Sequence, residues 1–310
     1  MVGYTIRRLL YIIPTILGVA VIIFVLFNVA GEDPVRIALG QHATPQAIAD
    51  LEAQWGLDQP LWKQFLDFLR QIVTFDYGAS YFTGERLGEA FASGALVSLS
   101  LTLPPFVLGL VINIVIAMLI AYYRGTWFDR FSTAIAVISM SVSYLVYIIA
   151  MQYFLAYELE WFPINGYAPG WDAIPYLALP WLIIIVVSIG PDVRIYRTIF
   201  LNEMQANYVR TARAKGVSER GVLFTHILKN AMIPVLTFTI VAVPFLILGM
   251  FLMERFFSIP GIGDLMISAI NNGDLPVLKG MTMYITITYA LFNLITDLLI
   301  AAVDPRVKLH

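Results

Sequence analysis

The sequence has no cysteine and few charged residues. Of its 310 residues only 13% are Asp, Glu, Lys or Arg, about half the share found in soluble globular proteins. The absence of cysteine excludes disulfides, thiolate metal sites and a lipid-modified cysteine. What dominates instead is hydrophobic sequence, at 59% of residues with a mean hydropathy of +0.79. This composition is typical of an all-α polytopic membrane protein.

Several catalytic signatures are also missing. There is no G-x-x-x-x-G-K-[ST] loop for a nucleotide, and neither H-E-x-x-H nor G-x-S-x-G occurs. The three histidines, His42, His226 and His310, are scattered along the chain. We therefore expect no catalytic residue, metal site or cofactor in this chain, and no nucleic-acid partner. An enzyme embedded in the membrane would need a nucleophile–base pair or metal ligands, and none can be assembled.

Six apolar segments are long enough to cross a bilayer, which takes about 20 helical residues. The predicted spans are residues 9–30, 95–122, 131–157, 174–193, 232–251 and 280–302. The apolar run after Arg7 and Arg8 is too long for a cleavable signal peptide, so the first span is expected to stay in the membrane. Prolines inside the spans predict kinks whose freed carbonyls neighbouring helices satisfy.

The positive charges favour one orientation. The N-terminus (1–8), the loops at 123–130 and 194–231 and the tail (303–310) hold 13 of the 19 basic residues, and the opposite loops hold 15 of the 21 acidic ones. By the positive-inside rule both termini are cytoplasmic. The loops at 31–94 and 252–279 then face outward, as in a multi-pass protein of a bacterial inner membrane.

The outer loop at 31–94 is too long for a simple connection. Thr44 followed by Pro45 is typical of a helix start, and Gly56 of its end. A second, amphipathic segment covers residues 61–73. We expect a small helical subdomain on the outer surface.

A polar, basic stretch at 202–237 interrupts the apolar sequence. Its composition predicts a helical hairpin, in which Gly216 ends the first helix in a left-handed conformation and Ser218 caps a second helix over 219–229. Positive-inside topology alone accounts for much of its charge. A compact hairpin in the longest basic loop further predicts a cytoplasmic partner, and small side chains allow that partner to approach the backbone closely.

The sequence of this stretch, YVRTARAKGVSERGVLFTHILKNAMIPV, resembles the conserved loop of ABC-importer permeases. Arg210 and Thr211 depart from the general E-A-A pattern but match its dipeptide/oligopeptide (nickel) branch. Further similarities are IRRLLYIIPTILGV, LDQPLWKQF, FDYGASY, MERFFSIPGIGDL and NLITDLLIAAVDPRVK. The chain is similar to the first, B-type permease of the branch's pair, across nearly its whole length.

The resemblance implies a six-span type I importer fold and a set of partners. These are a second homologous permease, two ATPase subunits that bring ATP and Mg, a periplasmic or lipid-anchored binding protein, and membrane lipid. It also implies an ATPase-coupling segment, made of Arg210, Thr211, Ala212, Arg213, Ala214, Lys215 and Gly216. Residues implied to meet the binding protein are Asp76, Gly78, Ser80, Pro260, Gly261 and Gly263, for which tight external turns are an equal interpretation.

Four polar residues inside spans are candidates for the transport pathway: Ser139, Ser143, Asn293 and Asp297. Asp297 is taken as the only carboxylate deep in a span. The serines equally suit helix packing or bonds to their own carbonyls, and Asp297 suits a bond to a neighbouring helix.

The implied function is ATP-driven import of di- or oligopeptides by alternating access. Nickel, glutathione or a peptide antibiotic are alternative substrates. A self-sufficient carrier would need more intramembrane charge, and a signalling subunit that uses the hairpin only for docking remains a further alternative.

Overall fold

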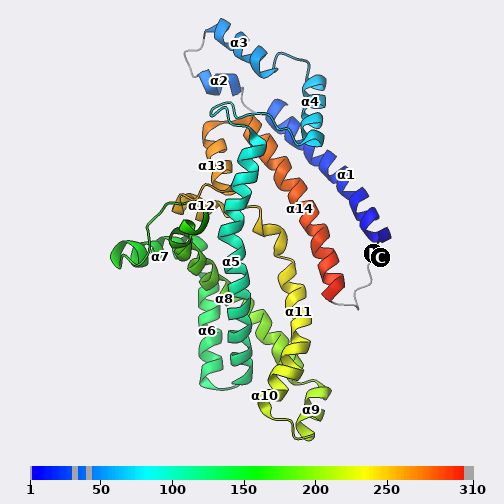
Figure 1. The fold of residues 1–310 in the computed structure, drawn as a ribbon, viewed down its shortest axis with the longest axis vertical. Helices are drawn as coiled ribbons and strands as arrows, with labels where there is room; N and C mark the ends of the chain where they lie inside the picture. Colours follow the sequence, from blue (N-terminus) through cyan, green and yellow to red (C-terminus); the bar gives the residue numbers. More distant parts are fainter. Residues whose placement is uncertain (1, 30–33, 40–43, 304–310) are drawn as a thin grey trace.

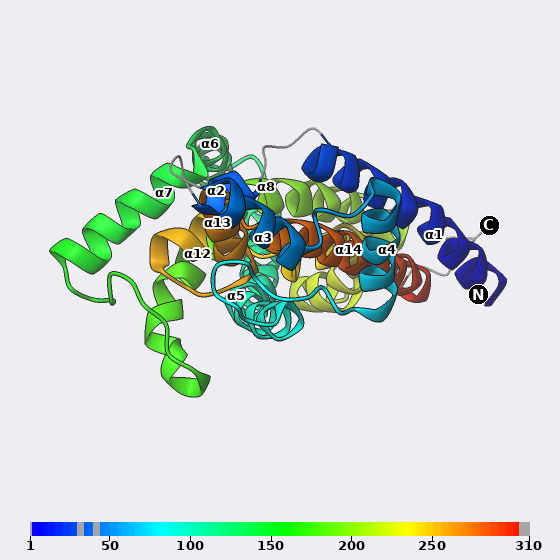
Figure 2. The ribbon, with the colours of Figure 1, turned by 90° about the horizontal axis from the view of Figure 1, so that it is seen from above.

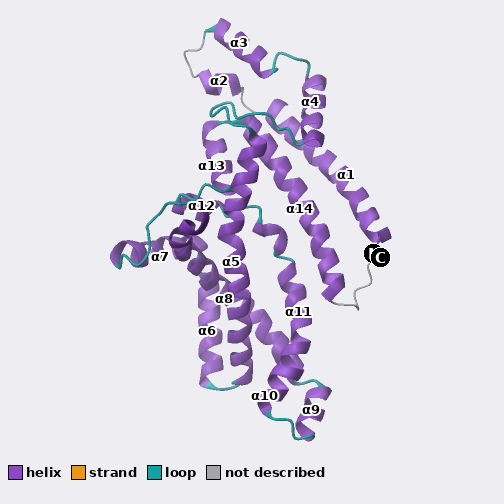
Figure 3. Ribbon diagram, in the orientation of Figure 1, coloured by secondary structure: helices purple, strands orange, loops and turns teal. Residues whose placement is uncertain are grey.

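The computed structural model describes residues 2–29, 34–39 and 44–303. Throughout these residues the regular elements are helices, apart from one isolated backbone bridge between Ala79 and Arg86 (Figure 3). Most of the predicted tail, parts of the predicted outer loop, His42 and His310 lie outside the described residues. The all-α fold class predicted from composition is confirmed.

Most of the helices follow one another with short connections; the longer ones are residues 75–86 and 159–169. The N-terminal half holds α1 (Val2–Phe24), its π-helical continuation η1 (Val25–Val29), α2 (Pro34–Leu39), α3 (Pro45–Trp55), α4 (Leu61–Thr74), α5 (Leu87–Tyr122), α6 (Trp127–Ser141), α7 (Tyr144–Met151) and the π-helical η2 (Gln152–Glu158). The C-terminal half holds the 3-10 turn η3 (Gly170–Ala173), α8 (Ile174–Met204), α9 (Asn207–Ala214), α10 (Glu219–Gly221), the π-helical η4 (Val222–Leu228), α11 (Lys229–Ile240), the 3-10 turn η5 (Val243–Leu246), α12 (Phe251–Phe257), α13 (Ile262–Asn272) and α14 (Leu275–Val303).

The molecule is elongated around the long pair α5 and α8, which makes its most extensive helix–helix contact (Figure 1). The short helices α9 and α10 form one tip, and α2, α3 and α4 form the opposite tip. Helix α1 packs along α14, on the side of the bundle away from α7 (Figure 2). Each tip therefore presents a small helical unit on the end of a long apolar bundle.

Five helical runs are long and apolar enough to cross a bilayer by themselves. They are Arg7–Val29, Leu87–Tyr122, Gly170–Met204, Glu219–Ile240 and Leu275–Ile300. Two further pairs of helices are long and apolar enough only when each pair is taken together. Helix α6 is followed by α7–η2 after a bend of 97°, and η5–α12 is followed by α13 after a bend of 70°. The described residues thus offer five to seven spans, against the six predicted, and the differences lie in the third and fifth.

The predicted third span, 131–157, is broken in its middle. Val142 and Ser143 are extended, with ψ of 131° and 141°, and the chain then turns into α7. The hydroxyl of Tyr147 donates to the carbonyl of Ser139 across the break at 3.1 Å. Apolar composition gave no sign of this break, because apolar residues continue through both halves of the predicted span.

The predicted fifth span, 232–251, also differs. Helix α11 ends at Ile240, and Pro244 lies in the first turn of η5 rather than inside a span. Proline fixes its own backbone angle and lacks an N–H, so it suits the start of a helical turn better than its interior. The chain from 241 to 250 consequently crosses the bundle as turns before α12.

Two adjacent prolines, Pro104 and Pro105, stay inside the continuous helix α5. Pro104 has no N–H for the carbonyl of Ser100, four residues earlier. The indole N–H of Trp181 on α8 donates to this carbonyl instead, at 3.1 Å. The expectation that a neighbouring helix satisfies a freed carbonyl is confirmed at this position.

The helical unit predicted after the first span is present. The Thr44 side chain accepts a hydrogen bond from the Ala47 N–H, and Gly56 ends α3 at a φ of 68°, as predicted. Helix α4 covers the predicted amphipathic segment and packs Phe65 and Phe68 against Phe24 of α1. This unit is therefore anchored to the first span by an aromatic cluster.

Candidate functional site

The α9–α10 hairpin is built from local signals. The N–H of Gly216 donates to the carbonyl of Arg213, and the N–H of Val217 donates to the carbonyl of Ala212. With Gly216 at a φ of 78°, this is a Schellman ending of α9. The Ser218 side chain then accepts from the N–H of Gly221 and caps α10. Both predicted caps are confirmed.

The base of the hairpin is apolar. Val209 and Ala212 are buried, as are Val222 and Ile227 of η4, and all four belong to one cluster with Phe200 of α8. Ala212 therefore holds the hairpin to the bundle. Its predicted place on the partner-facing side is wrong, since it lies one helical turn from Val209 on the same buried face.

The opposite face of the hairpin is exposed. The exposed residues of the predicted coupling segment are Arg210, Thr211, Arg213, Ala214, Lys215 and Gly216. Arg213 forms a two-point ion pair with Glu219, at 2.9 and 3.2 Å, which ties α9 to α10. Among the described residues no carboxylate lies within ion-pair distance of Arg210 or Lys215, so their charges are available to a partner.

The hairpin is continuous with a membrane-length helix. From Glu219 through η4 and α11 to Ile240 the chain is one helical run, without the boundary predicted between 231 and 232. This continuous run offers a direct connection between α10 and α11. The hairpin is mechanically joined to the bundle by covalent helix and by the apolar contact beneath α9.

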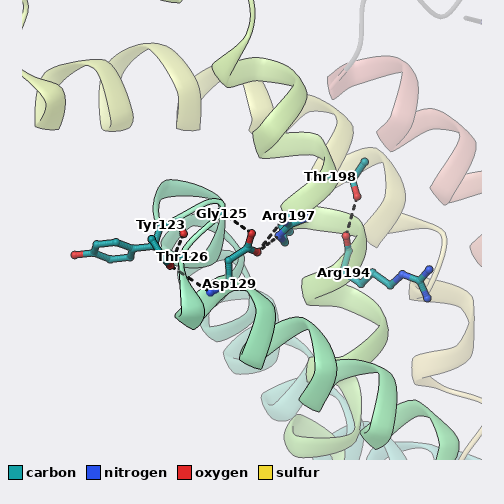
Figure 4. Close-up of polar contacts among 7 residues, drawn as sticks. All are labelled: Tyr123, Gly125, Thr126, Asp129, Arg194, Arg197 and Thr198. Atoms are coloured by element: carbon teal, nitrogen blue, oxygen red, sulfur yellow. Dashed lines mark hydrogen bonds and ion pairs between the residues drawn. The ribbon is translucent and has the colours of Figure 1, made fainter.

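A buried ion pair fastens the neighbouring turn (Figure 4). Asp129, only 6% exposed, accepts from the Arg197 guanidinium of α8 at 2.7 and 2.8 Å and from the Gly125 N–H at 2.9 Å. Thr126 caps α6 beneath it. In the sequence, Arg197 lies just beyond the predicted fourth span, and Asp129 was missed as its partner. The Thr126-x-x-Asp129 capping pattern was the available signal.

An apolar hollow of about 960 Å³ is lined by residues of α5, α8 and α11 and of the segment 241–252. Its walls include Phe106, Ile184, Phe238 and Phe245. Polar side chains reach it from α8 and α11: Ser188, Asp192, Tyr196 and Thr239. A mostly apolar concave surface with a few polar groups is the usual form of a small-molecule site.

Asp192 is held in place by α5. The side-chain N–H of Asn113, which is fully buried, donates to Asp192 and to Ser188, each at 3.0 Å. The Asn113 oxygen has no partner among the described residues, an arrangement that costs about 1–3 kcal/mol for a buried acceptor. The amide is thus oriented entirely toward the hollow's polar groups.

The position of Asp192 corrects the prediction that Asp297 is the only carboxylate deep in a span. The fourth span was predicted to end at residue 193, which placed Asp192 at an interface. Helix α8 instead continues to Met204, so Asp192 lies well inside a membrane-length helix and Asp297 is not the only such carboxylate. A lone Asn113 in a strongly apolar segment was the sequence signal for this cluster.

The four predicted pathway residues do not line the hollow. Ser139 donates to the Ala136 carbonyl and lies against α8, where a Cβ on Gly190 would come within 2.5 Å of its hydroxyl. Ser143 is exposed at the break before α7, and Asn293 is half-buried on α14. Asp297 forms an ion pair with Arg8 of α1 at 3.1 Å. The positions of Ser139 and Asp297 fit the packing alternative, whereas the pathway role of Ser143 and Asn293 stays a prediction.

The first predicted docking turn is partly buried. Asp76 and Gly78 are exposed, but the Ser80 hydroxyl donates to Asp274 at 2.5 Å and is buried. The Tyr81 N–H also donates to Asp274, at 3.3 Å. Burial, with the Asp274 carboxylate nearby, raises the pKa of Tyr81 to about 12, so its hydroxyl stays protonated. Ser80 secures the loop to the α13–α14 turn and is not a surface for docking.

The second predicted docking turn encloses a carboxylate. Glu254 is 0% exposed and accepts from the Ser98 hydroxyl at 2.7 Å and from the N–H groups of Met250 and Asp264 at 3.0 Å. Gly261 and Gly263 are buried against it, and only Pro260 of the three predicted residues is exposed. The glycines are needed because a Cβ at Gly261 would lie 2.5 Å from that carboxylate.

No group of three or more His, Asp or Glu side chains that could hold a metal ion occurs in the part of the chain that the structure describes.

Comparison with known proteins gives two family matches. The family model of the binding-protein-dependent transport system inner membrane component matches residues 113–309. A second family model, for the N-terminal part of such membrane components, matches residues 1–104. A dipeptide transport system permease protein of Alkalihalophilus pseudofirmus is 31% identical over 332 residues, covering 99% of this chain and 100% of the relative. A glutathione transport system permease protein of Salmonella typhimurium is 34% identical over 309 residues, covering 99% of each.

Proposed function

Because this chain belongs to the family of inner membrane components of binding-protein-dependent transport systems, we propose that it is one of two permease subunits of an ATP-driven importer of di- or oligopeptides. A full-length relative is named as a dipeptide permease. The chain itself is a transport subunit, and ATP with Mg is used by separate ATPase subunits. The membrane is the bacterial inner membrane, with both termini in the cytoplasm.

The observation that carries this proposal is the two-faced hairpin. Its base is locked into the bundle by Val209 and Ala212, while Arg210, Ala214 and Gly216 are exposed. An ATPase subunit binds the exposed face on the cytoplasmic side. When the ATPases close, the hairpin moves as a body and α11 moves with it, which changes the wall of the hollow.

The hollow is one half of the translocation pathway in this proposal. Its apolar wall includes the exposed Val241 and Phe245, and a second homologous permease covers it from the open side. Within a bilayer such pairing is driven by close side-chain packing and interhelical hydrogen bonds, because lipid tails are as apolar as the surface that is covered. A binding protein delivers the substrate to the opposite tip, near α3 and α4.

Glutathione is the second candidate substrate, because a relative of equal coverage is named for it. Both candidates are small peptides with a free amino group, so the two share one machinery. Nickel and peptide antibiotics remain weaker alternatives that only the resemblance implies.

Reconstitution tests the proposal. This chain, a second permease, two ATPases and the binding protein are placed in liposomes, and uptake of labelled dipeptide, glutathione and Ni²⁺ is compared with and without ATP. We expect ATP-dependent uptake fastest for the dipeptide. Uptake by this chain alone without ATP would establish a carrier instead, and faster uptake of glutathione would select the second candidate.

The variant Arg210→Glu is expected to weaken ATPase binding by about tenfold or more, since a charge reversed at a contact loses attraction and adds repulsion. Arg210 is exposed and has no described ion-pair partner, so the fold should change by less than about 0.5 kcal/mol. Co-purification of the ATPases measures the effect. Arg124→Glu, exposed on the α5–α6 turn, is the matched control, and equal binding by both variants would contradict docking through α9.

A further inference from the structure

Asp192 is a carboxylate without a counter-ion in an apolar hollow. No Lys or Arg of the described residues forms an ion pair with it; its described hydrogen bond is the one from Asn113. The walls around it are mainly phenylalanine and aliphatic side chains. A carboxylate in such surroundings favours a cationic ligand, because opposite charges attract strongly where water is scarce.

The arrangement is built to keep the carboxylate in one position. Asn113 on α5 is fully buried and bonds Asp192 and Ser188 together. One turn further along α8, Tyr196 shares a 2.7 Å hydrogen bond with Thr239 of α11. Helix α8 thus contributes the carboxylate and the hydroxyls of Ser188 and Tyr196, α11 contributes the hydroxyl of Thr239, and Asn113 of α5 orients the carboxylate.

We propose that Asp192 binds the terminal ammonium group of a peptide in transit, which rests on the proposed function. An ammonium group carries three N–H donors, which match a carboxylate with nearby hydroxyls. The apolar walls accept side chains of varied shape, and Tyr196 and Thr239 lie where the peptide backbone follows. A metal ion fits poorly, because one carboxylate and three hydroxyls provide too few strong ligands.

The positions of Asp192 and Thr239 also connect ligand binding to the transport cycle. Thr239 lies on α11, which is continuous with the hairpin, whereas Asp192 lies on α8. A movement of α11 relative to α8 changes the spacing between the Asp192 carboxylate and the Thr239 hydroxyl. The ammonium site is therefore assembled in one position of α11 and opened in another.

The test uses the complete reconstituted complex with saturating binding protein and labelled alanyl-alanine, whose only cation is its amino terminus. Asp192→Asn is expected to lower uptake by about tenfold or more, since it removes a charge-assisted hydrogen bond. Asp192→Glu keeps the charge and should retain most of the uptake. An asparagine can still accept from Asn113, so a purely structural role would leave Asp192→Asn unaffected.

Two comparisons make the outcome decisive. Asp172→Asn, exposed before α8, is the matched control and should transport as the unmodified complex does, with equal co-purification of the ATPases in all variants. Uptake by Asp192→Asn equal to this control overturns the ammonium site. A loss confined to lysine-containing peptides assigns Asp192 to side-chain cations and overturns the terminal assignment. If the unmodified complex imports no peptide at all, the proposed function fails instead.

Discussion

Arg197→Met is expected to destabilise the protein by about 3–5 kcal/mol, because it leaves a buried carboxylate without its counter-ion. Asp129 would keep only the Gly125 N–H as a partner in a position that is 6% exposed. The effect should appear as a lower melting temperature of the detergent-solubilised protein, followed by size-exclusion chromatography with fluorescence detection. Weaker joining of α6 to α8 should also lower transport.

Two further variants separate the ion pair from other effects. Arg194→Met removes an exposed cation three residues earlier on α8, drawn beside the pair in Figure 4, and should change stability little. The double variant Asp129→Leu with Arg197→Met should recover much of the loss, since apolar replacement of both partners is often neutral. If Arg197→Met melts at the same temperature as Arg194→Met, the pair contributes nothing to stability.

Gly261→Ala should have an effect of similar size at the opposite side of the bundle. Its Cβ would lie 2.5 Å from the Glu254 carboxylate and from the Ser98 hydroxyl, so the carboxylate must leave its three donors. Overpacking and lost hydrogen bonds to a buried charge are together expected to cost about 3 kcal/mol or more. The same melting assay, together with uptake by the reconstituted complex, measures the result.

The matched control is Gly18→Ala on α1, where a new Cβ meets nothing within 4 Å. That change should be neutral or slightly stabilising, since alanine favours helix more than glycine does. Adding Glu254→Ala to Gly261→Ala makes room for the new methyl group and should recover part of the stability. If the Gly261→Ala and Gly18→Ala proteins melt at the same temperature, the turn at Gly261 accommodates the new methyl group without loss of stability.

These two sites explain how a mostly apolar bundle keeps its geometry. Asp129 joins the α5–α6 turn to α8, and Glu254 joins α12 and α13 to Ser98 on α5. Each fixes an end of the α5–α8 pair with directional bonds, which apolar packing alone does not supply. The α5 residues that line the hollow lie between Ser98 and the α5–α6 turn, so both ends of this wall are held by directional bonds.

The sequence by itself determined the class of the protein and its local turns. Low charge and long apolar runs indicate helices that cross a membrane. In a bilayer the backbone N–H and C=O groups must form hydrogen bonds with one another, and a helix does this within a single segment. The caps at Thr44, Gly56, Gly216 and Ser218 were predictable because each depends on residues within one helical turn. The resemblance carried by the hairpin then indicated the family, which the comparisons confirmed.

Only the tertiary structure decided which polar groups are buried and where helices break. In the sequence, Asp129, Asp192 and Glu254 are all isolated acidic residues. In the structure Asp129 is paired with Arg197, Asp192 faces the hollow and Glu254 is enclosed by glycines. Their partners lie on helices distant in sequence, so no local pattern specifies them. The same holds for the bend after Ser141 and the burial of Ala212, because the face that a helix buries is chosen by the neighbours against which it packs.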